Sequence, residues 1–72
     1  MKPFTARQII DVLTANGFVL SRQNGSHRIY TKTSTGNMVP VPVHGGNKPL
    51  PIGTFLAIVK QSRLPRSAFI RR

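Results

Sequence analysis

The segment 22-RQNGSHRIY-30 contains the residues best suited to chemistry. His27 lies one residue after an Asn-Gly pair, and Arg22 and Arg28 flank it. Because imidazole titrates near neutrality, a histidine can take the proton of a ribose 2′-OH or protonate a leaving 5′ oxygen. Arginines and backbone N–H groups can stabilise the extra negative charge of the transition state. The segment therefore holds the parts needed to cleave RNA without a metal.

The same residue types also have ordinary structural roles. His27 would flank a tight turn, where imidazole can simply bond the loop backbone, and residue chemistry alone favours that role. His44 follows a proline-bearing segment and can cap a loop. The other basic residues either contact an anion or form a solvated surface: Lys48, Lys60, Arg63, Arg66, Arg71 and Arg72. At this point both interpretations stay open.

Length and charge narrow the classes of partner. A chain of 72 residues has the size of one domain, so we predict a single domain over residues 1–72. Eleven Lys or Arg residues face one acid, Asp11, which gives a formal net charge of +10. The hydrophobic content of 39% indicates a folded domain and not a disordered basic tail. The expected partners are polyanions: nucleic acid first, an acidic protein second and an anionic membrane third.

The composition also argues against a metal or a cofactor. One acid excludes a carboxylate pair, and two histidines without cysteine or glutamate make a poor metal site. There is no Gly-rich phosphate loop. The beginning, 1-MKPFTARQII-10, lacks the apolar run of a signal peptide, and no segment is apolar enough to span a bilayer. We expect a cytoplasmic protein with no metal, no cofactor and no membrane partner.

Helical spacing appears at both ends of the chain. Thr5 and Gln8 form a capping box, and Gly17 is a helix stop, which predicts a helix over Thr5–Asn16. A second helix is predicted to begin between Pro51 and Thr54. Four of its residues share one face: Phe55, Ile58, Val59 and Ser62. Leu64-Pro65 should end or kink this helix, and residues 67–72 are predicted to form a final helical turn.

Strand patterns occupy the middle of the chain. Alternation predicts a strand over Phe18–Gln23. Asn24-Gly25 predicts a type I′ turn, which needs positive φ at both central residues. A second strand should run from Ser26 or His27 to Thr33, and a third should begin at Met38 after a looser turn. The predicted fold is therefore α+β, with the order αβββα, a three-stranded antiparallel sheet and both helices packed on one face.

The third predicted strand, 38-MVPVPVH-44, contains two prolines two residues apart. Their missing N–H groups lie on the same side of the strand, and proline is tolerated only on an unpaired edge. Val39, Val41 and Val43 should therefore pair with the second strand, and the proline side should face outward and block edge-to-edge association. The third strand is predicted to be an edge.

Four segments in order resemble the HicA-type toxin family: 16-NGF-18, 22-RQNGSHRIY-30, 41-VPVH-44 and 53-GTFLAIVKQ-61. The resemblance covers residues 5–64, and the R-Q-x-G-S-H segment is its most specific part. It implies a double-stranded-RNA-binding-domain-like αβββα fold. It also implies an mRNA interferase, which is an endoribonuclease that inhibits translation. Its partners would be mRNA and an acidic HicB-type antitoxin.

The resemblance also assigns roles to residues. The histidine of G-S-H, which is required for RNA cleavage in the family, corresponds to His27, and the histidine of V-P-x-H corresponds to His44. We expect His27 to be catalytic as general acid or base. We expect six residues to contact RNA: Arg22, Ser26, Arg28, Lys32, His44 and Lys48. Where the family often has glycine near the end of the second helix, this chain has Arg63, which adopts a left-handed cap less readily.

Two other functions remain as alternatives. A non-catalytic RNA-binding module of the same fold predicts salt-sensitive binding without cleavage. A DNA-binding regulator predicts binding to duplex DNA and no RNA cleavage, because DNA lacks the 2′-OH. The start of the second helix, 51-PIGTF-55, lacks a lysine cluster for duplex phosphates. We therefore expect single-stranded or structured mRNA as the substrate.

Overall fold

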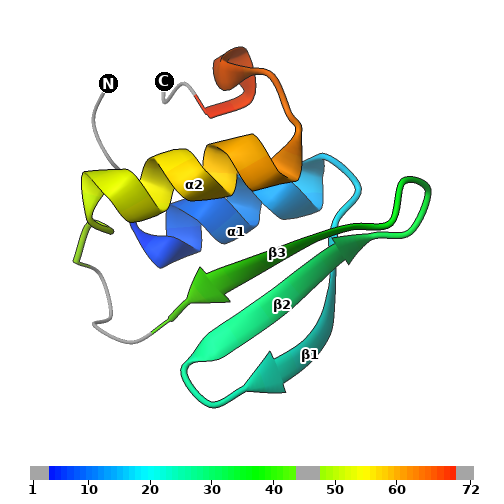
Figure 1. The fold of residues 1–72 in the computed structure, drawn as a ribbon, viewed down its shortest axis with the longest axis horizontal. Helices are drawn as coiled ribbons and strands as arrows, with labels where there is room; N and C mark the ends of the chain where they lie inside the picture. The colour runs from blue at the N-terminus through cyan, green and yellow to red at the C-terminus, as the bar shows by residue number, and fades with distance from the viewer. Residues whose placement is uncertain (1–3, 44–47, 70–72) are drawn as a thin grey trace.

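The computed structural model describes residues 4–43 and 48–69. The elements follow the order α1 (Ala6–Ala15), β1 (Val19–Asn24), β2 (His27–Lys32), β3 (Asn37–Pro42), α2 (Ile52–Ser62) and the 3-10 helix η1 (Arg66–Phe69). Figure 1 shows the helices on one side and the antiparallel sheet, in the order β1-β2-β3, on the other. This arrangement confirms the predicted αβββα fold, which is like that of double-stranded-RNA-binding domains.

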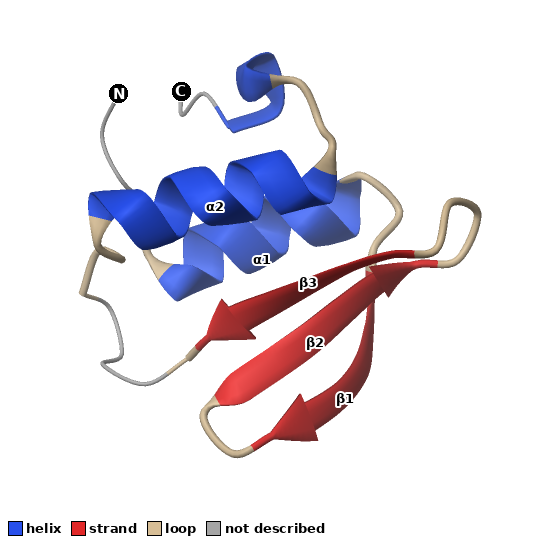
Figure 2. Ribbon diagram, viewed as in Figure 1, coloured by secondary structure: helices blue, strands red, loops and turns tan. Residues whose placement is uncertain are grey.

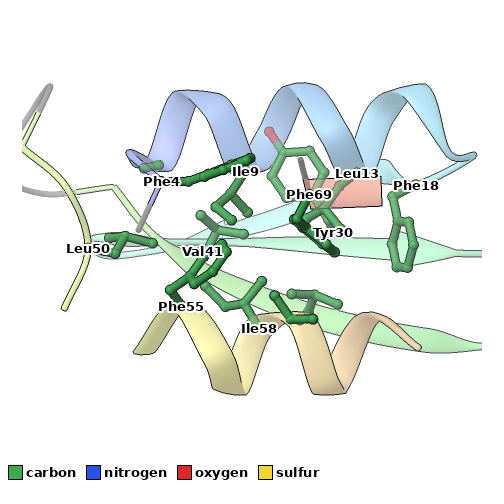
Figure 3. Packing of buried hydrophobic residues seen from close by; sticks show 13 residues of the cluster. Phe4, Ile9, Leu13, Phe18, Tyr30, Val41, Leu50, Phe55, Ile58 and Phe69 are labelled. Carbon is green, nitrogen blue, oxygen red and sulfur yellow. The ribbon is translucent and has the colours of Figure 1, made fainter. Parts of the chain in front are cut away.

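The hydrophobic core lies between the two helices and one face of the sheet. Both helices cover the same side, and α2 runs beside β3 (Figure 2). Side chains from both helices and the sheet meet in this layer (Figure 3). The valines of β3, Val39 and Val41, are fully buried there, whereas every residue of β1 is exposed. The helices therefore cover the β3 side of the sheet and leave β1 open to solvent.

Helix α1 begins and ends as its sequence predicts. Gln8 N donates to Thr5 Oγ1 at 3.2 Å, and Thr5 N donates to Gln8 Oε1 at 2.9 Å, so the capping box is formed. At the other end Gly17 has φ +91°, and Phe18 N donates to the Leu13 carbonyl. Because Gly17 is left-handed, the backbone N–H groups after the helix reach its last carbonyls, and the chain turns into β1.

Helix α2 buries the predicted face, and its four residues Phe55, Ile58, Val59 and Ser62 are all buried. It begins after Pro51 without a side-chain cap. It ends at Arg63, whose φ of +59° lies in the left-handed region. No helix within residues 4–43 and 48–69 has the length and apolar character needed to cross a bilayer.

The β1–β2 turn differs from the sequence prediction. Asn24 pairs with His27, so the central residues are Gly25 and Ser26, and only Gly25 has positive φ, at +62°. The predicted type I′ turn centred on Asn24-Gly25 is therefore wrong. The pairing register shifts between Leu20 and Arg22. The strand predicted over Phe18–Gln23 runs over Val19–Asn24.

Strand β3 is the predicted edge. Val39 pairs with Tyr30 and Val41 with Arg28, and Val43 N donates to the Ser26 carbonyl at 2.7 Å. The prolines leave the outer side of β3 without ladder donors at two positions. No further strand pairs there among the described residues.

Three phenylalanines pack the residue before α1 and the helix η1 against α2. The ring centroids of Phe4 and Phe55 are 5.2 Å apart, and Phe69 contacts both at 6.2 and 6.0 Å. Leu50 N donates to the Phe4 carbonyl at 2.9 Å, so the segment before α2 is held against the start of α1. The predicted final turn is a 3-10 helix that begins at Arg66; residues 70–72 of that prediction lie outside the described chain.

Candidate nucleic-acid interface

His27 lies on the sheet face that the helices leave open. Val39 and Val41 point into the core, so residues paired with Pro40 and Pro42 point to the opposite face. His27 pairs with Pro42 and Ile29 with Pro40. Arg22 pairs with Ile29, which places the guanidinium on the same open face as the imidazole. Both side chains are exposed.

Arg28 and Lys32 lie on the face of the sheet that the helices cover. Arg28 pairs with the buried Val41, and its Nε is buried without a hydrogen-bond partner. The Cε of Lys32 lies 3.5 Å from the position that a Cβ on Gly17 would occupy, beside the end of α1. The structure therefore does not bring these two cations to the face that carries His27.

A groove of about 670 Å³ contains His27 on one side and α2 on the other. Pro40 and Pro42 line it from β3. The segment before α2 contributes Lys48, and the helix contributes small or polar residues: Gly53, Thr54, Ala57 and Gln61. Lys48 is exposed, so its ammonium is available to an anion in the groove.

A second hollow of about 690 Å³ continues from the first along the same edge. The two share Pro40, Ala57 and Gln61. The second ends at Lys60 and Arg63 of α2 and at the residues that open β3. We call the two hollows together the α2–β3 groove; it has Lys48 near His27 and two cations at its far end.

Small residues and prolines form this groove. Gly53 lies inside α2, and a Cβ added to it would meet nothing within 4 Å, so no packing contact requires a glycine there. Gly53, Ala57 and Gln61 recur every four residues and therefore share one stripe of α2. Sequence reasoning did not include this stripe in the site. Its only sequence signal is the helical spacing of small residues opposite the buried face.

Ser26 and His44 are two further predicted RNA contacts. Ser26 is exposed in the turn next to His27, and its carbonyl is occupied by the Val43 N–H. His44 lies outside the described residues. Among the described residues, no three His, Asp or Glu side chains come together as a possible metal site.

The charged side chains that line the groove, Lys48, Lys60 and Arg63, are all cations. The only acid in the sequence, Asp11, lies on α1 and forms an exposed ion pair with Arg7, with Nε 3.8 Å from Oδ1. No carboxylate therefore lines the groove, and an anionic ligand meets no like charge there.

Comparisons with known proteins agree with this geometry. A model of the HicA toxins of bacterial toxin–antitoxin systems matches residues 6–64, which include both helices, the whole sheet and the α2–β3 groove. A comparison with curated proteins finds no significant match. Because the match covers most of the 72 residues, this chain belongs to the HicA toxin family.

Proposed function

We propose that this toxin is an mRNA interferase, a metal-independent endoribonuclease that cleaves mRNA and thereby inhibits translation. The observation that carries the proposal is the position of His27, exposed on the open sheet face and lining a groove with Lys48 and no carboxylate. A polyanion can enter this groove, and an imidazole is the side chain suited to move a proton near neutral pH.

The proposed reaction uses the ribose of the substrate as nucleophile. The 2′-OH loses its proton, its oxygen forms a bond to the adjacent phosphorus, and the 5′ oxygen leaves with a proton. The products are a 2′,3′-cyclic phosphate and a 5′-hydroxyl end. His27 acts as general base or general acid in this step. One imidazole does not perform both proton transfers in a single concerted step, so water or His44 takes the second role.

The RNA contacts that we propose follow the open face and the groove. Arg22 shares the face of His27, Ser26 precedes it in the turn, and Lys48 lines the same groove. These groups can hold the phosphates on either side of the scissile bond. We assign no contact at this bond to Arg28 or Lys32, because alternation places them on the helix side. His44 remains a proposed RNA contact on the strength of its sequence motif.

The proposed protein partner is an acidic HicB-type antitoxin. Membership in a toxin–antitoxin family implies such a partner. The net charge of +10 favours a strongly acidic surface on that protein. An antitoxin bound over His27 and the groove would exclude RNA directly.

The test is cleavage of single-stranded RNA in EDTA by the wild-type chain and by His27→Ala. We expect wild-type cleavage and a loss of at least a hundredfold in the variant, because general acid–base groups contribute roughly 10²–10⁴ in rate. Gln23→Ala is the matched control, since Gln23 is exposed, lies one pair from His27 and points to the other face.

Retained RNA binding by folded His27→Ala separates catalysis from binding. Equal cleavage by wild type and His27→Ala would overturn the catalytic role. An absence of cleavage by both, with salt-sensitive RNA binding, would instead favour the non-catalytic RNA-binding module.

A further inference from the structure

The far end of the α2–β3 groove has an unusual backbone. Arg63 adopts φ +59° at the end of α2, and it is the only non-glycine residue with positive φ in the part of the chain that the structure describes. Helices commonly end with a left-handed residue, which is usually glycine because a Cβ is strained there. An arginine at this position therefore costs stability that a glycine would not.

Hydrogen bonds on both sides hold this conformation. Arg63 N donates to the Lys60 carbonyl at 3.2 Å, and Leu64 N donates to Ser62 Oγ at 3.1 Å. Asn37 Nδ2 donates to the Ser62 carbonyl at 3.1 Å, which ties the end of α2 to the beginning of β3. The surrounding structure thus fixes the direction in which residue 63 projects.

The Arg63 side chain is exposed, and within residues 4–43 and 48–69 it makes no hydrogen bond or ion pair. A cation near the end of a helix favours the helix dipole, but Lys60 already supplies one in the last turn of α2. Packing and helix electrostatics therefore do not explain the strained arginine.

The position of Arg63 in the groove does explain it. Lys60 and Arg63 line the hollow that continues, through Pro40, Ala57 and Gln61, into the one containing His27. Backbone strain of this kind is found where it positions a functional group. A guanidinium suits a phosphate because its planar fork can donate two parallel hydrogen bonds.

We propose that Arg63 binds a phosphate of the RNA strand at the far end of the α2–β3 groove, several nucleotides from the scissile bond. This inference rests on the proposed function of His27. The stripe from Gly53 to Gln61 is about 12 Å long at 1.5 Å per residue. Phosphates of one strand are spaced by at least about 3.4 Å, so at most three or four nucleotides separate the two ends. Arg63 is a binding residue and takes no part in the proton transfers.

The experiment measures binding of a fluorescent single-stranded RNA 10-mer by anisotropy over a series of salt concentrations. Every protein carries His27→Ala, so the RNA stays intact. Arg63→Gly is compared with Arg63→Lys, which keeps the charge, and with Arg7→Gln, which removes one charge on α1. Melting temperatures of all four proteins are measured by circular dichroism. Cleavage by proteins with intact His27 is measured in parallel.

We expect Arg63→Gly to bind the RNA about tenfold more weakly, because one charge-assisted contact is lost. Its slope of log K against log salt should fall by about 0.7. Its melting temperature should rise by roughly 4 °C, because glycine relieves the left-handed strain. Arg63→Lys keeps the charge but not the planar fork, so it should bind more weakly than the parent and more tightly than Arg63→Gly. Arg7→Gln should bind like the parent.

Several results would overturn this assignment. Unchanged binding by Arg63→Gly, or an equal loss in Arg7→Gln, would show that no phosphate is bound at residue 63. Weaker binding with a lower melting temperature would make Arg63 a structural residue. Labelled polyglutamate is measured in the same anisotropy assay, and unchanged RNA binding with weaker binding to polyglutamate would assign Arg63 to an acidic protein. If His27→Ala cleaves like wild type, the proposed catalysis fails independently of these results.

Discussion

The two helices of this toxin bury similar faces but differ at their ends. In α1, Ile9 and Leu13 are fully buried, and in α2 the same is true of Phe55. Helix α1 has a complete capping box, and it is followed by a left-handed glycine. Helix α2 has no side-chain cap, contains a glycine in its first turn and ends on a left-handed arginine.

This difference separates residues that stabilise their helix from residues that do not. Burial of one face accounts for the presence of both helices. The two unfavourable features of α2, Gly53 and Arg63, both line the α2–β3 groove. Nothing on the core side of α2 requires them. The groove side of α2 therefore has a sequence that helix stability alone does not explain, as expected for a ligand-binding surface.

The largest loss of stability is expected from a substitution on the buried face of α2. Phe55→Ala should lower the free energy of unfolding by about 3–5 kcal/mol, because it removes a ring that packs on Phe4 and Phe69. Domains of this size are stable by only roughly 4–11 kcal/mol, so the variant should lose a large part of its stability. Urea denaturation followed by circular dichroism measures the change.

Leu56→Ala is the matched control for that experiment. Leu56 is the next residue on α2, is 41% exposed and lies outside the core. We expect a loss of less than about 1 kcal/mol. Equal losses in the two variants would show that the buried face does not stabilise α2, and the contrast between packing and groove residues would fail.

A smaller effect is expected at the beginning of α1. Thr5→Ala removes the hydroxyl that accepts from Gln8 N, which should cost about 1 kcal/mol. RNA cleavage measured well below the melting temperature should not change, because α1 does not line the groove. Thr14→Ala is the control: its hydroxyl bonds carbonyls within the same helix, and its removal should change stability by about 0.5 kcal/mol or less. A loss of cleavage in folded Thr5→Ala would contradict this division of roles.

Local sequence signals predicted the parts of the fold that local chemistry determines. The capping box and Gly17 gave α1 its ends, because those signals act within a few residues. The spaced prolines identified β3 as an edge for a similar reason. The β1–β2 turn was mispredicted because the pairing of strands decides the register. Asn24 pairs with His27, so it belongs to β1 and not to the turn.

The site was predicted less completely than the fold. His27 was proposed from its motif, and its role stays a prediction; Arg28 was grouped with it because the two are adjacent in sequence. Adjacent residues of a strand point to opposite faces, so alternation already separated them. The contribution of α2 was not predicted, because residues 53–63 meet β3 only through tertiary packing. Sequence spacing shows a stripe on a helix but not the element that lies opposite it.

The smallest expected change in stability, and the sharpest test of the contrast, is at Gly53. Gly53→Ala should raise the free energy of unfolding by about 0.5–1 kcal/mol, since alanine is the better helix former and the added methyl clashes with nothing. Under the proposed function the same methyl enters the groove that contains His27, so RNA binding and cleavage should weaken. Thermal unfolding and the RNA anisotropy assay measure the two effects on the same protein.

Two variants make the result at Gly53 decisive. Gly53→Leu places a larger side chain at the same point and should weaken RNA binding more than alanine does, if the RNA backbone approaches α2 closely. Ile52→Ala changes the neighbouring exposed residue, which does not line the groove, and should leave RNA binding unchanged. If Gly53→Ala were more stable and bound RNA as well as wild type, the glycine would have no ligand to accommodate. The difference between α1 and α2 would then not mark a binding surface at this end of the groove.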